Sequence, residues 1–240
     1  MTKRAMLSKD HPCRSCDVSA EALCRALDVE TLADFRNQGG RLHLTAGQTL
    51  FHQGDPADCV FSLTSGVVKL YAILSDGRRQ IVAFLFPGDF VGFETQQSHG
   101  FAAEAIGDTT LCRVLKRRFE WFVDHYPALA EARYRRATAE LAIAQERMVT
   151  LGRQTAAERL AGFLSDIQRR AGFRGRDGAN LVPLPMSRGD IADYLGLTKE
   201  TVSRELTNLR KARVIRSHSL TLIEILDPRG IGALACGIAA

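Results

Sequence analysis

Short apolar segments separated by glycine-containing turns occupy the chain between residues 42 and 114. The segments CVFSLTSGVVKLYAIL and RRQIVAFLFPGDFVGF show alternating or continuous apolar character, and turns such as Gly54-Asp55 and Asp76-Gly77 divide them. Short strands at nearly regular spacing are typical of a double-sheet jelly roll. The pattern therefore predicts a β-barrel, a kind of fold that often holds a small molecule.

A second pattern, two short helices around a tight turn, covers residues 187–212. Ser187 and Asp190 form an S-x-x-D capping box for the first helix. Gly196 is predicted to end that helix, because glycine adopts the left-handed conformation of a C-cap without a Cβ penalty. Thr198 is then placed to cap the second helix. Residues 214–226, VIRSHSLTLIEIL, predict two short strands that form a wing beside the helices.

The second of these helices is predicted to have one apolar and one polar face. It buries Val202, Leu206 and Leu209, while long hydrogen-bonding side chains lie opposite. Such a helix, braced by another, is what reading the DNA major groove requires. A solvated amphipathic helix pair is the alternative, and the caps, the glycine turn and the polar residue types favour DNA binding. The residues predicted to contact DNA are Ser187, Arg188, Lys199, Glu200, Thr201, Ser203, Arg204 and Asn208.

A longer helical stretch is predicted from about residue 127 to 153. Apolar residues recur there at alternating spacings of three and four, which is the heptad pattern of a helix–helix seam. The helix either packs on its own barrel or pairs with a second copy. We favour the dimer, because a helix–turn–helix protein usually reads two half-sites around a two-fold axis. The predicted seam consists of Tyr134, Ala137, Leu141, Ala144, Met148 and Leu151.

The segment between the long helix and the helix–turn–helix is predicted to be a helix followed by a loop. Thr155 and Glu158 form another capping box, and the helix that they start runs to about residue 171. Gly172, Gly175 and Gly178 then predict a loop.

Composition and charge narrow the class of protein. The chain of 240 residues is 45% hydrophobic and 25% charged, which is ordinary for a soluble globular protein of two domains. No apolar run approaches the about 18 residues of a membrane span, and the first residues lack a secretory h-region, so we expect a cytoplasmic protein. Residues 1–152 carry 18 Lys and Arg against 18 Asp and Glu, and residues 153–240 carry 14 against 9, so the whole net charge of +5 lies in the second part. A basic second part suits phosphate contacts.

Three of the six cysteines lie close together as C-x2-C-x7-C, at Cys13, Cys16 and Cys24. In a chain expected to be cytosolic, this spacing indicates ligands rather than disulfides, either for zinc, with His11 as a candidate further ligand, or for an iron–sulfur cluster. Incidental thiols in a partly ordered tail are the alternative. A thiol-based redox enzyme would need a reactive thiolate beside a resolving partner, and the chain lacks a thioredoxin-like βαβ setting around C-x-x-C, so we predict no enzyme.

The order of barrel, long helix and helix–turn–helix resembles the CRP/FNR superfamily of bacterial transcription regulators. The similar motifs are GQTLFHQGD, SGVVKLY, PGDFVGF, AAERLAGFL and SRGDIADYLGLTKETVSREL, and the resemblance covers nearly the whole chain. It implies an α+β fold with an N-terminal jelly-roll barrel of the cyclic-nucleotide-binding kind, a long dimerisation helix and a C-terminal winged helix–turn–helix. The corresponding segments are 1–30 (cysteine-rich), 31–126 (barrel), 127–153 (dimerisation helix) and 154–240 (DNA-binding domain).

Within the superfamily, the cysteines resemble the oxygen-responsive FNR branch, and their spacing is similar to its FnrN type. That resemblance implies a [4Fe–4S] cluster on Cys13, Cys16, Cys24 and Cys112, and no such role for Cys59 or Cys236. The E-x-x-S-R of Glu200, Ser203 and Arg204 is similar to the FNR and FixK branch. It implies a homodimer that binds a palindrome like TTGAT-N4-ATCAA and acts on RNA polymerase, by default as an activator.

The resemblance also bears on cyclic-nucleotide binding and on the role of the cysteines. The cyclic-nucleotide branch carries an acidic residue after the glycine of its phosphate cassette and an arginine pair further on, whereas this chain has Phe93 and Ala102-Ala103 there. We therefore predict that it binds no cyclic nucleotide. Beside the cluster-bound oxygen sensor, the alternative is a cluster-free FixK-like activator whose cysteines respond to oxidation or bind zinc.

Overall fold

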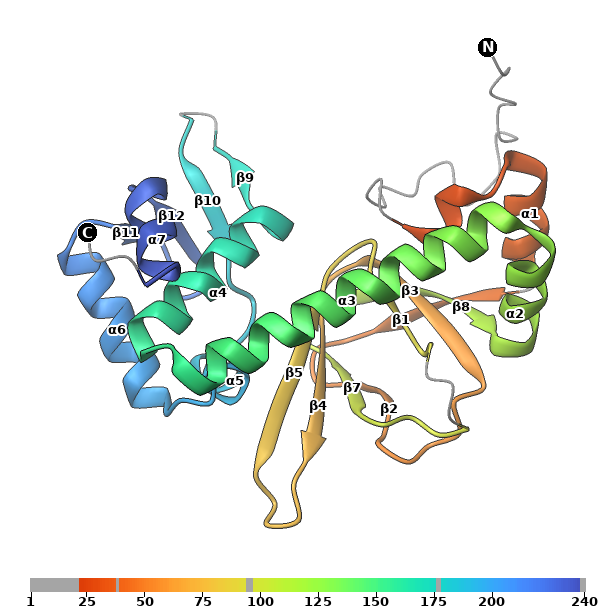
Figure 1. Ribbon diagram of the computed structural model, residues 1–240, viewed down its shortest axis with the longest axis horizontal. Coiled ribbons are helices and arrows are strands. Elements are labelled where there is room, and N and C mark those ends of the chain that lie inside the picture. Colours follow the sequence, from red (N-terminus) through yellow and green to blue (C-terminus); the bar gives the residue numbers. More distant parts are fainter. Residues whose placement is uncertain (1–21, 38, 94–96, 176–177, 238–240) are drawn as a thin grey trace. The chain divides into compact units, whose positions relative to one another are not determined.

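The computed structural model describes residues 22–37, 39–93, 97–175 and 178–237. The chain forms two compact units, one of residues 1–72 and 82–141 and the other of residues 73–81 and 142–240. The boundary falls within the long helix α3, Pro127–Arg153, whose predicted extent the structure confirms. Figure 1 shows the elements of both units along the chain.

Two four-stranded antiparallel sheets form the barrel (Figure 1). The first has the order β1–β8–β3–β6, with β1 Gly39–Leu44, β8 Thr109–Leu115, β3 Cys59–Ser65 and β6 Phe90–Val91. The second has the order β2–β7–β4–β5, with β2 Thr49–Phe51, β7 Ala102–Ala105, β4 Val68–Ile73 and β5 Arg79–Leu85. The two sheets confirm the β-barrel predicted from the alternating segments.

The inner faces of the two sheets share one core. Leu63 and Leu111 come from the first sheet and Val68 and Ala103 from the second, and each is at most 2% exposed. Leu63 lies opposite Leu111 in the antiparallel register of β3 and β8. Because side chains alternate along a strand, the neighbours of Leu63 on β3 and of Leu111 on β8 face the other side of the sheet.

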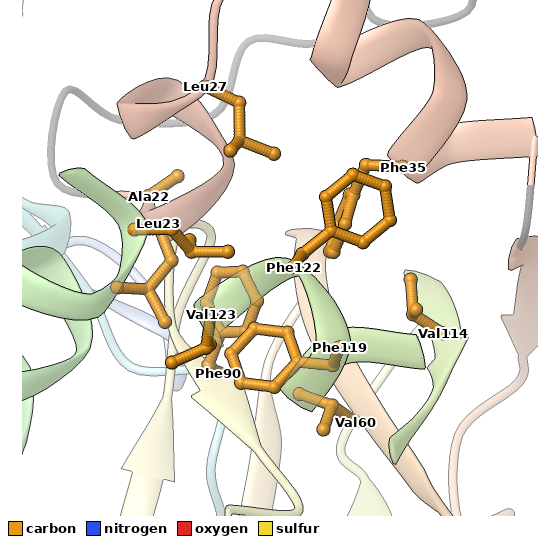
Figure 2. Packing of buried hydrophobic residues seen from close by; sticks show 11 residues of the cluster. Ala22, Leu23, Leu27, Phe35, Val60, Phe90, Val114, Phe119, Phe122 and Val123 are labelled. Atoms are coloured by element: carbon orange, nitrogen blue, oxygen red, sulfur yellow. The ribbon is translucent and has the colours of Figure 1, made fainter. Parts of the chain in front are cut away.

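That other side is covered by a second cluster of buried side chains, which we call the outer layer (Figure 2). Three short helices supply five of its eleven members: η1 Leu23–Ala26, α1 Val29–Asn37 and α2 Lys116–His125. These helices were not among the elements predicted from the sequence, and the layer extends to the first turn of α3. Its members are Ala22, Leu23, Leu27, Phe35, Val60, Phe90, Val114, Phe119, Phe122, Val123 and Leu129.

The second unit contains the helix–turn–helix, α5 Arg188–Leu195 and α6 Lys199–Lys211. The helix α4, Ala156–Ala171, precedes it and begins at the predicted capping box of Thr155 and Glu158. The predicted wing is present as β11 Ile215–Ser217 and β12 Leu222–Ile225. A terminal helix, α7 Pro228–Ala235, was not predicted, although Asp227 caps it and proline opens it.

The predicted loop after α4 is wrong in part. This segment contains β9 Phe173–Arg174 and β10 Asn180–Pro183, which extend the wing to a four-stranded sheet of order β11–β12–β10–β9. The strand β9 was not predicted, because it has only two residues, lies between two glycines and shows no periodicity of its own. It forms only by pairing with β10. Among the helices of the described residues, none is long and apolar enough to cross a membrane.

The turn between α5 and α6 gives a first prediction. Gly196 has φ +63° and ψ +41°, the left-handed conformation in which a Cβ costs about 1–2 kcal/mol. Gly196→Ala should therefore lower the thermal unfolding midpoint by roughly 2–4 °C for each kcal/mol lost, as followed by circular dichroism. The matched control is Gly152→Ala within α3, where a Cβ meets no atom within 4 Å and the helix should gain up to about 1 kcal/mol. Equal shifts in the two variants would contradict the left-handed cap.

Candidate nucleic-acid interface and thiol site

Three helix caps set the geometry of the helix–turn–helix. The Ser187 hydroxyl oxygen accepts from the Asp190 amide while the Asp190 carboxylate accepts from the Ser187 amide, which completes the predicted capping box. Gly196 ends α5 in the left-handed conformation, as predicted. Thr198 then caps α6, because its hydroxyl oxygen accepts from the Thr201 amide at 3.1 Å. All three could be predicted from the sequence because each depends on residues at most five positions apart.

The helix α6 buries one face and exposes the other. Val202, Leu206 and Leu209 are buried at 0, 9 and 6% exposure, as predicted. The polar residues predicted to contact DNA lie on the accessible side of α6: Lys199, Glu200, Ser203, Arg204 and Asn208 are exposed, and Thr201 is half-buried. Glu200, Ser203 and Arg204 are at i, i+3 and i+4, so they share one face of the first turns. The helix therefore offers a carboxylate, a hydroxyl and a guanidinium to the same short stretch of a groove.

Glu205 organises this face and was not singled out from the sequence. Its Oε1 accepts from Arg204 Nε at 3.4 Å, and its Oε2 accepts from Asn208 Nδ2 at 3.1 Å. Its side chain is 16% exposed, compared with 65% for Arg204. A partly buried carboxylate thus holds two of the predicted DNA-contacting side chains. No periodic signal marks Glu205, because it lies between the buried and the exposed faces.

Arg188 was predicted to contact DNA and is partly engaged by the wing. Its Nη2 donates to the Leu220 carbonyl oxygen at 3.3 Å, at the tip of the β11–β12 hairpin. Its Nη1 is buried and has no hydrogen-bond partner among the described residues. Burial lowers the pKa of Arg188. The guanidinium therefore braces the wing tip and keeps one donor near the start of α5, where backbone amides attract anions.

The predicted dimer seam lies on the surface of the protomer. Tyr134, Leu141 and Met148 are 70, 60 and 72% exposed, and Leu151 is 43% exposed. Ala137 and Ala144, which complete the stripe, are exposed as well. Tyr134, Ala137 and Leu141, which belong to the same unit as the barrel, are not buried against it, as the alternative would require. Large apolar side chains in one exposed row are characteristic of an interface with another molecule.

Two of the four predicted cluster ligands, Cys24 and Cys112, border the outer layer. Cys24 lies in η1 and packs against that layer as a partly buried residue. Cys112 lies on β8 opposite Ser62, one step along the ladder from the pair Leu63 and Leu111, whose side chains fill the barrel interior. By alternation it shares a face with Val114, an outer-layer residue. Cys24 therefore packs on the outer layer from η1, and Cys112, 88 positions further along the chain, lies on the sheet face that this layer covers.

Cys13, Cys16 and His11 lie outside the described residues. Within the described residues, no group of three or more His, Cys, Asp or Glu side chains is placed to hold a metal ion. Cys24 and Cys112 are the two predicted ligands that the described residues include, and thiolates are the usual ligands of zinc and of iron–sulfur clusters.

The remaining cysteines have different surroundings. Cys59 lies on β3 as predicted and is half-buried rather than buried. Burial raises the pKa of its thiol against the opposing effect of Arg113, so it stays protonated and weakly reactive. Cys236 is exposed at the end of α7.

The positions that carry phosphate-binding groups in cyclic-nucleotide sensors are apolar and packed here. The Phe93 ring stacks on Phe90 at 5.6 Å and lies 5.5 Å from the Phe119 ring. Ala102 and Ala103 are 3 and 0% exposed on β7. None of these three side chains has a charge to offer a phosphate.

Comparison with known families matches both parts of the chain. The model of the cyclic nucleotide-binding domain matches residues 41–126. The model of the Crp-like helix-turn-helix domain matches residues 158–234. The two matches cover the barrel with α2 and the DNA-binding part of the second unit.

Individual proteins are similar over most of the chain. The nitrogen fixation regulation protein FixK of Bradyrhizobium diazoefficiens is 42% identical over 94% of this chain and 94% of its own. The transcriptional activator protein FnrL of Cereibacter sphaeroides is 36% identical over 85% of this chain and 84% of its own. The structure of FixK2 from Bradyrhizobium japonicum has a TM-score of 0.76 and 37% identity, covering 84% of this chain and 98% of that one.

Proposed function

Because the chain belongs to the CRP/FNR family of DNA-binding transcription regulators, we propose that it is an activator whose dimer reads a palindrome like TTGAT-N4-ATCAA under the control of its cysteines. The family consists of regulators rather than enzymes and acts as dimers on DNA. The observation that carries the proposal is the exposed row of Glu200, Ser203 and Arg204 on α6. RNA polymerase is the partner that an activator of this family requires.

The first form of cysteine control is a FixK-like regulator without an iron–sulfur cluster. It is supported by the identity to a protein named FixK, 42%, which exceeds the 36% to FnrL. In this form Cys13, Cys16, Cys24 and Cys112 respond to oxidation or bind zinc. Oxidation of a thiol that borders a packed apolar layer introduces polar atoms there and weakens the packing.

The second form is the oxygen-responsive regulator, and it is supported by the packing of Cys24 on the outer layer and the position of Cys112 on the sheet face that this layer covers. When bound, a [4Fe–4S] cluster would supply an oxygen-labile link between the N-terminal segment and β8 through Cys13, Cys16, Cys24 and Cys112. Leu23 of η1 and Leu129 of α3 belong to the same outer layer. Any change that detaches η1 therefore removes packing from the start of the dimerisation helix, in either form.

We also propose that the barrel binds no cyclic nucleotide, although it matches that domain model. Phe93, Ala102 and Ala103 supply no charge where such sensors hold the phosphate, and burying an unpaired phosphate is strongly unfavourable.

Metal and sulfide content of protein purified without oxygen distinguishes the two forms. The cluster-bound form should contain about four iron and four sulfide per chain and absorb broadly in the visible range until air is admitted. The FixK-like form should contain iron and sulfide at background, with zinc or with reduced thiols whose oxidation weakens DNA binding. Cys112→Ser should abolish whichever response is present, because it removes a ligand or a responsive thiol.

Cys59→Ser is the matched control, since that thiol lies on the neighbouring strand and should change neither metal content nor response. Full iron content in Cys112→Ser would contradict the ligand assignment. DNA binding that is indifferent to both oxygen and thiol oxidants would contradict cysteine control in both forms.

A further inference from the structure

Arg159, near the start of α4, donates hydrogen bonds to the ends of two other helices. Its Nη2 donates to the Leu151 carbonyl oxygen in the last turn of α3 at 2.8 Å, and its Nη1 donates to the Leu195 carbonyl oxygen at the end of α5 at 3.0 Å. Its Nε donates to the Gln154 carbonyl oxygen at 3.0 Å. Carbonyls in the last turn of a helix have no intrahelical partner. A cation beside them also interacts favourably with the negative end of the helix dipole. One guanidinium thus ties α3, the α3–α4 connection and α5 together.

A second contact joins α3 to α5 one turn earlier. The Arg147 guanidinium carbon lies 4.2 Å from the centroid of the Tyr194 ring, and Arg147 also donates a hydrogen bond to the Tyr194 hydroxyl. Burial lowers the pKa of Arg147 to about 10, so the side chain is still charged at neutral pH. Tyr194 also packs on the Phe163 ring of α4, with centroids 5.4 Å apart. Arg147 and Leu151 are four residues apart, so one face of the end of α3 contacts α5 directly through Arg147 and is joined to it at Leu151 through Arg159.

These contacts fix the direction of the reading helix relative to the end of the dimerisation helix. The helices α5 and α6 are joined by a turn of three residues, Gly196 to Thr198, and are packed against each other, so α6 follows α5. Adding or removing one base pair between two half-sites moves them by about 3.4 Å along the DNA and rotates them by about a tenth of a turn. A dimer with firmly held reading helices accepts one spacing, whereas a dimer with loosely held ones accepts several.

We propose that Arg159, supported by the pair of Arg147 and Tyr194, is a positioning residue that sets the half-site spacing which the dimer accepts. The inference rests on the proposed reading of a palindrome by a dimer. It adds a determinant of specificity that touches no base, since Arg159 acts only through the backbone of α3 and α5.

The test measures dissociation constants by fluorescence anisotropy on four duplexes. Three are palindromes: one has the four-base-pair spacer of the proposed site, one has a spacer shorter by one base pair, and one has a spacer longer by one base pair. The fourth duplex contains a single half-site. Arg159→Gln should reduce the preference for the best spacing by about tenfold, the equivalent of one lost charge-assisted hydrogen bond. Its affinity for the single half-site should stay within about twofold of the parent, because α6 itself is unchanged.

Three further variants make the result decisive. Arg159→Lys should restore part of the preference, because an ammonium group still reaches one of the carbonyls. Tyr194→Leu should also reduce the spacing preference, because it removes the contact of α5 with Arg147. This variant replaces Arg159→Gln in the test if Arg159→Gln fails to fold. Arg153→Gln, an exposed arginine at the end of α3, removes the same charge and should keep the parental preference.

Unchanged spacing preference in both Arg159→Gln and Tyr194→Leu would overturn the inference. A uniform loss on all four duplexes, with the preference retained, would also overturn it, since that is the result of general destabilisation. A parent that fails to bind the palindromes would refute the proposed function itself, and this inference with it.

Discussion

Arg204→Ala is expected to weaken binding to the palindrome by about 1–3 kcal/mol per half-site, hence about 2–6 kcal/mol for the dimer, and to relax the preference for guanine. An arginine pairs with O6 and N7 of guanine, and a glutamate accepts from N4 of cytosine. Glu200 and Arg204 are one turn apart on the exposed face of α6, so they are placed to read neighbouring base pairs on opposite strands. Before DNA binds, Glu205 accepts from the guanidinium at 3.4 Å, and because the Arg204 side chain is 65% exposed this contact costs little to exchange.

Lys199→Ala is the control for sequence reading. Lys199 is exposed at the first position of α6, where a long cation reaches phosphate rather than base edges. Its loss should weaken all sequences alike and reduce the slope of log K against log salt by about 0.9 for each phosphate contact removed. Selection of binding sites from a random pool separates the two variants. If Arg204→Ala selected the same guanine as the parent, the assignment of Arg204 to that base would be wrong.

Ser203 illustrates how the structure sharpens an expectation from the sequence. Its hydroxyl donates to the Lys199 carbonyl oxygen at 2.9 Å, four residues back along α6. The donor is therefore already used, and the side chain presents a small surface to the groove. This arrangement supports the sequence-based expectation that Ser203 lets a thymine methyl group approach.

The helix–turn–helix was predictable in detail because its signals are local. The caps at Ser187, Gly196 and Thr198 each act through neighbours within five residues, and the structure confirms all of them. The long helix was predictable because its apolar stripe repeats over almost three heptads. By contrast, α1 and α2 are short and pack on partners far away in the sequence, and β9 has only two residues and forms by pairing with β10. The buried Phe119, Phe122 and Val123 of α2 do follow helical spacing, and this signal was present but lay between a strand and a longer helix.

The hydrogen bonds of Arg159 to α3, α5 and the α3–α4 connection were not predictable, because they join one side chain to three backbone carbonyls. Backbone carbonyls leave no mark on residue identity, so nothing in the sequence around Leu151 or Leu195 indicates a partner. The placement of Cys24 beside the layer reached by Cys112 is of the same kind, since it depends on the register of β3 and β8. The role of the thiols stays a prediction, and the structure adds that Cys24 packs on a layer to which Leu129 of α3 also belongs.

Ala144→Asp is expected to shift the protein from dimer to monomer. The exposed stripe of α3 presents Leu141 and Met148 at 60 and 72% exposure, and Ala144 lies between them on the same stripe. In a two-fold seam a residue at the crossing meets its own symmetry mate. Two carboxylates buried together without partners cost several kcal/mol, so the dimer should be strongly weakened.

The control is Ala139→Asp, the same substitution on an exposed alanine that lies outside the predicted seam. Both variants should keep the helix content of the parent in circular dichroism, because each changes one exposed position of a 27-residue helix. Analytical ultracentrifugation without oxygen should then give a monomer for Ala144→Asp and a dimer for Ala139→Asp. The monomer should retain weak binding to a single half-site, since α6 is intact, and should lose the added affinity for the palindrome that two linked half-site contacts provide. A dimer of unchanged mass in Ala144→Asp would place the seam elsewhere on the molecule.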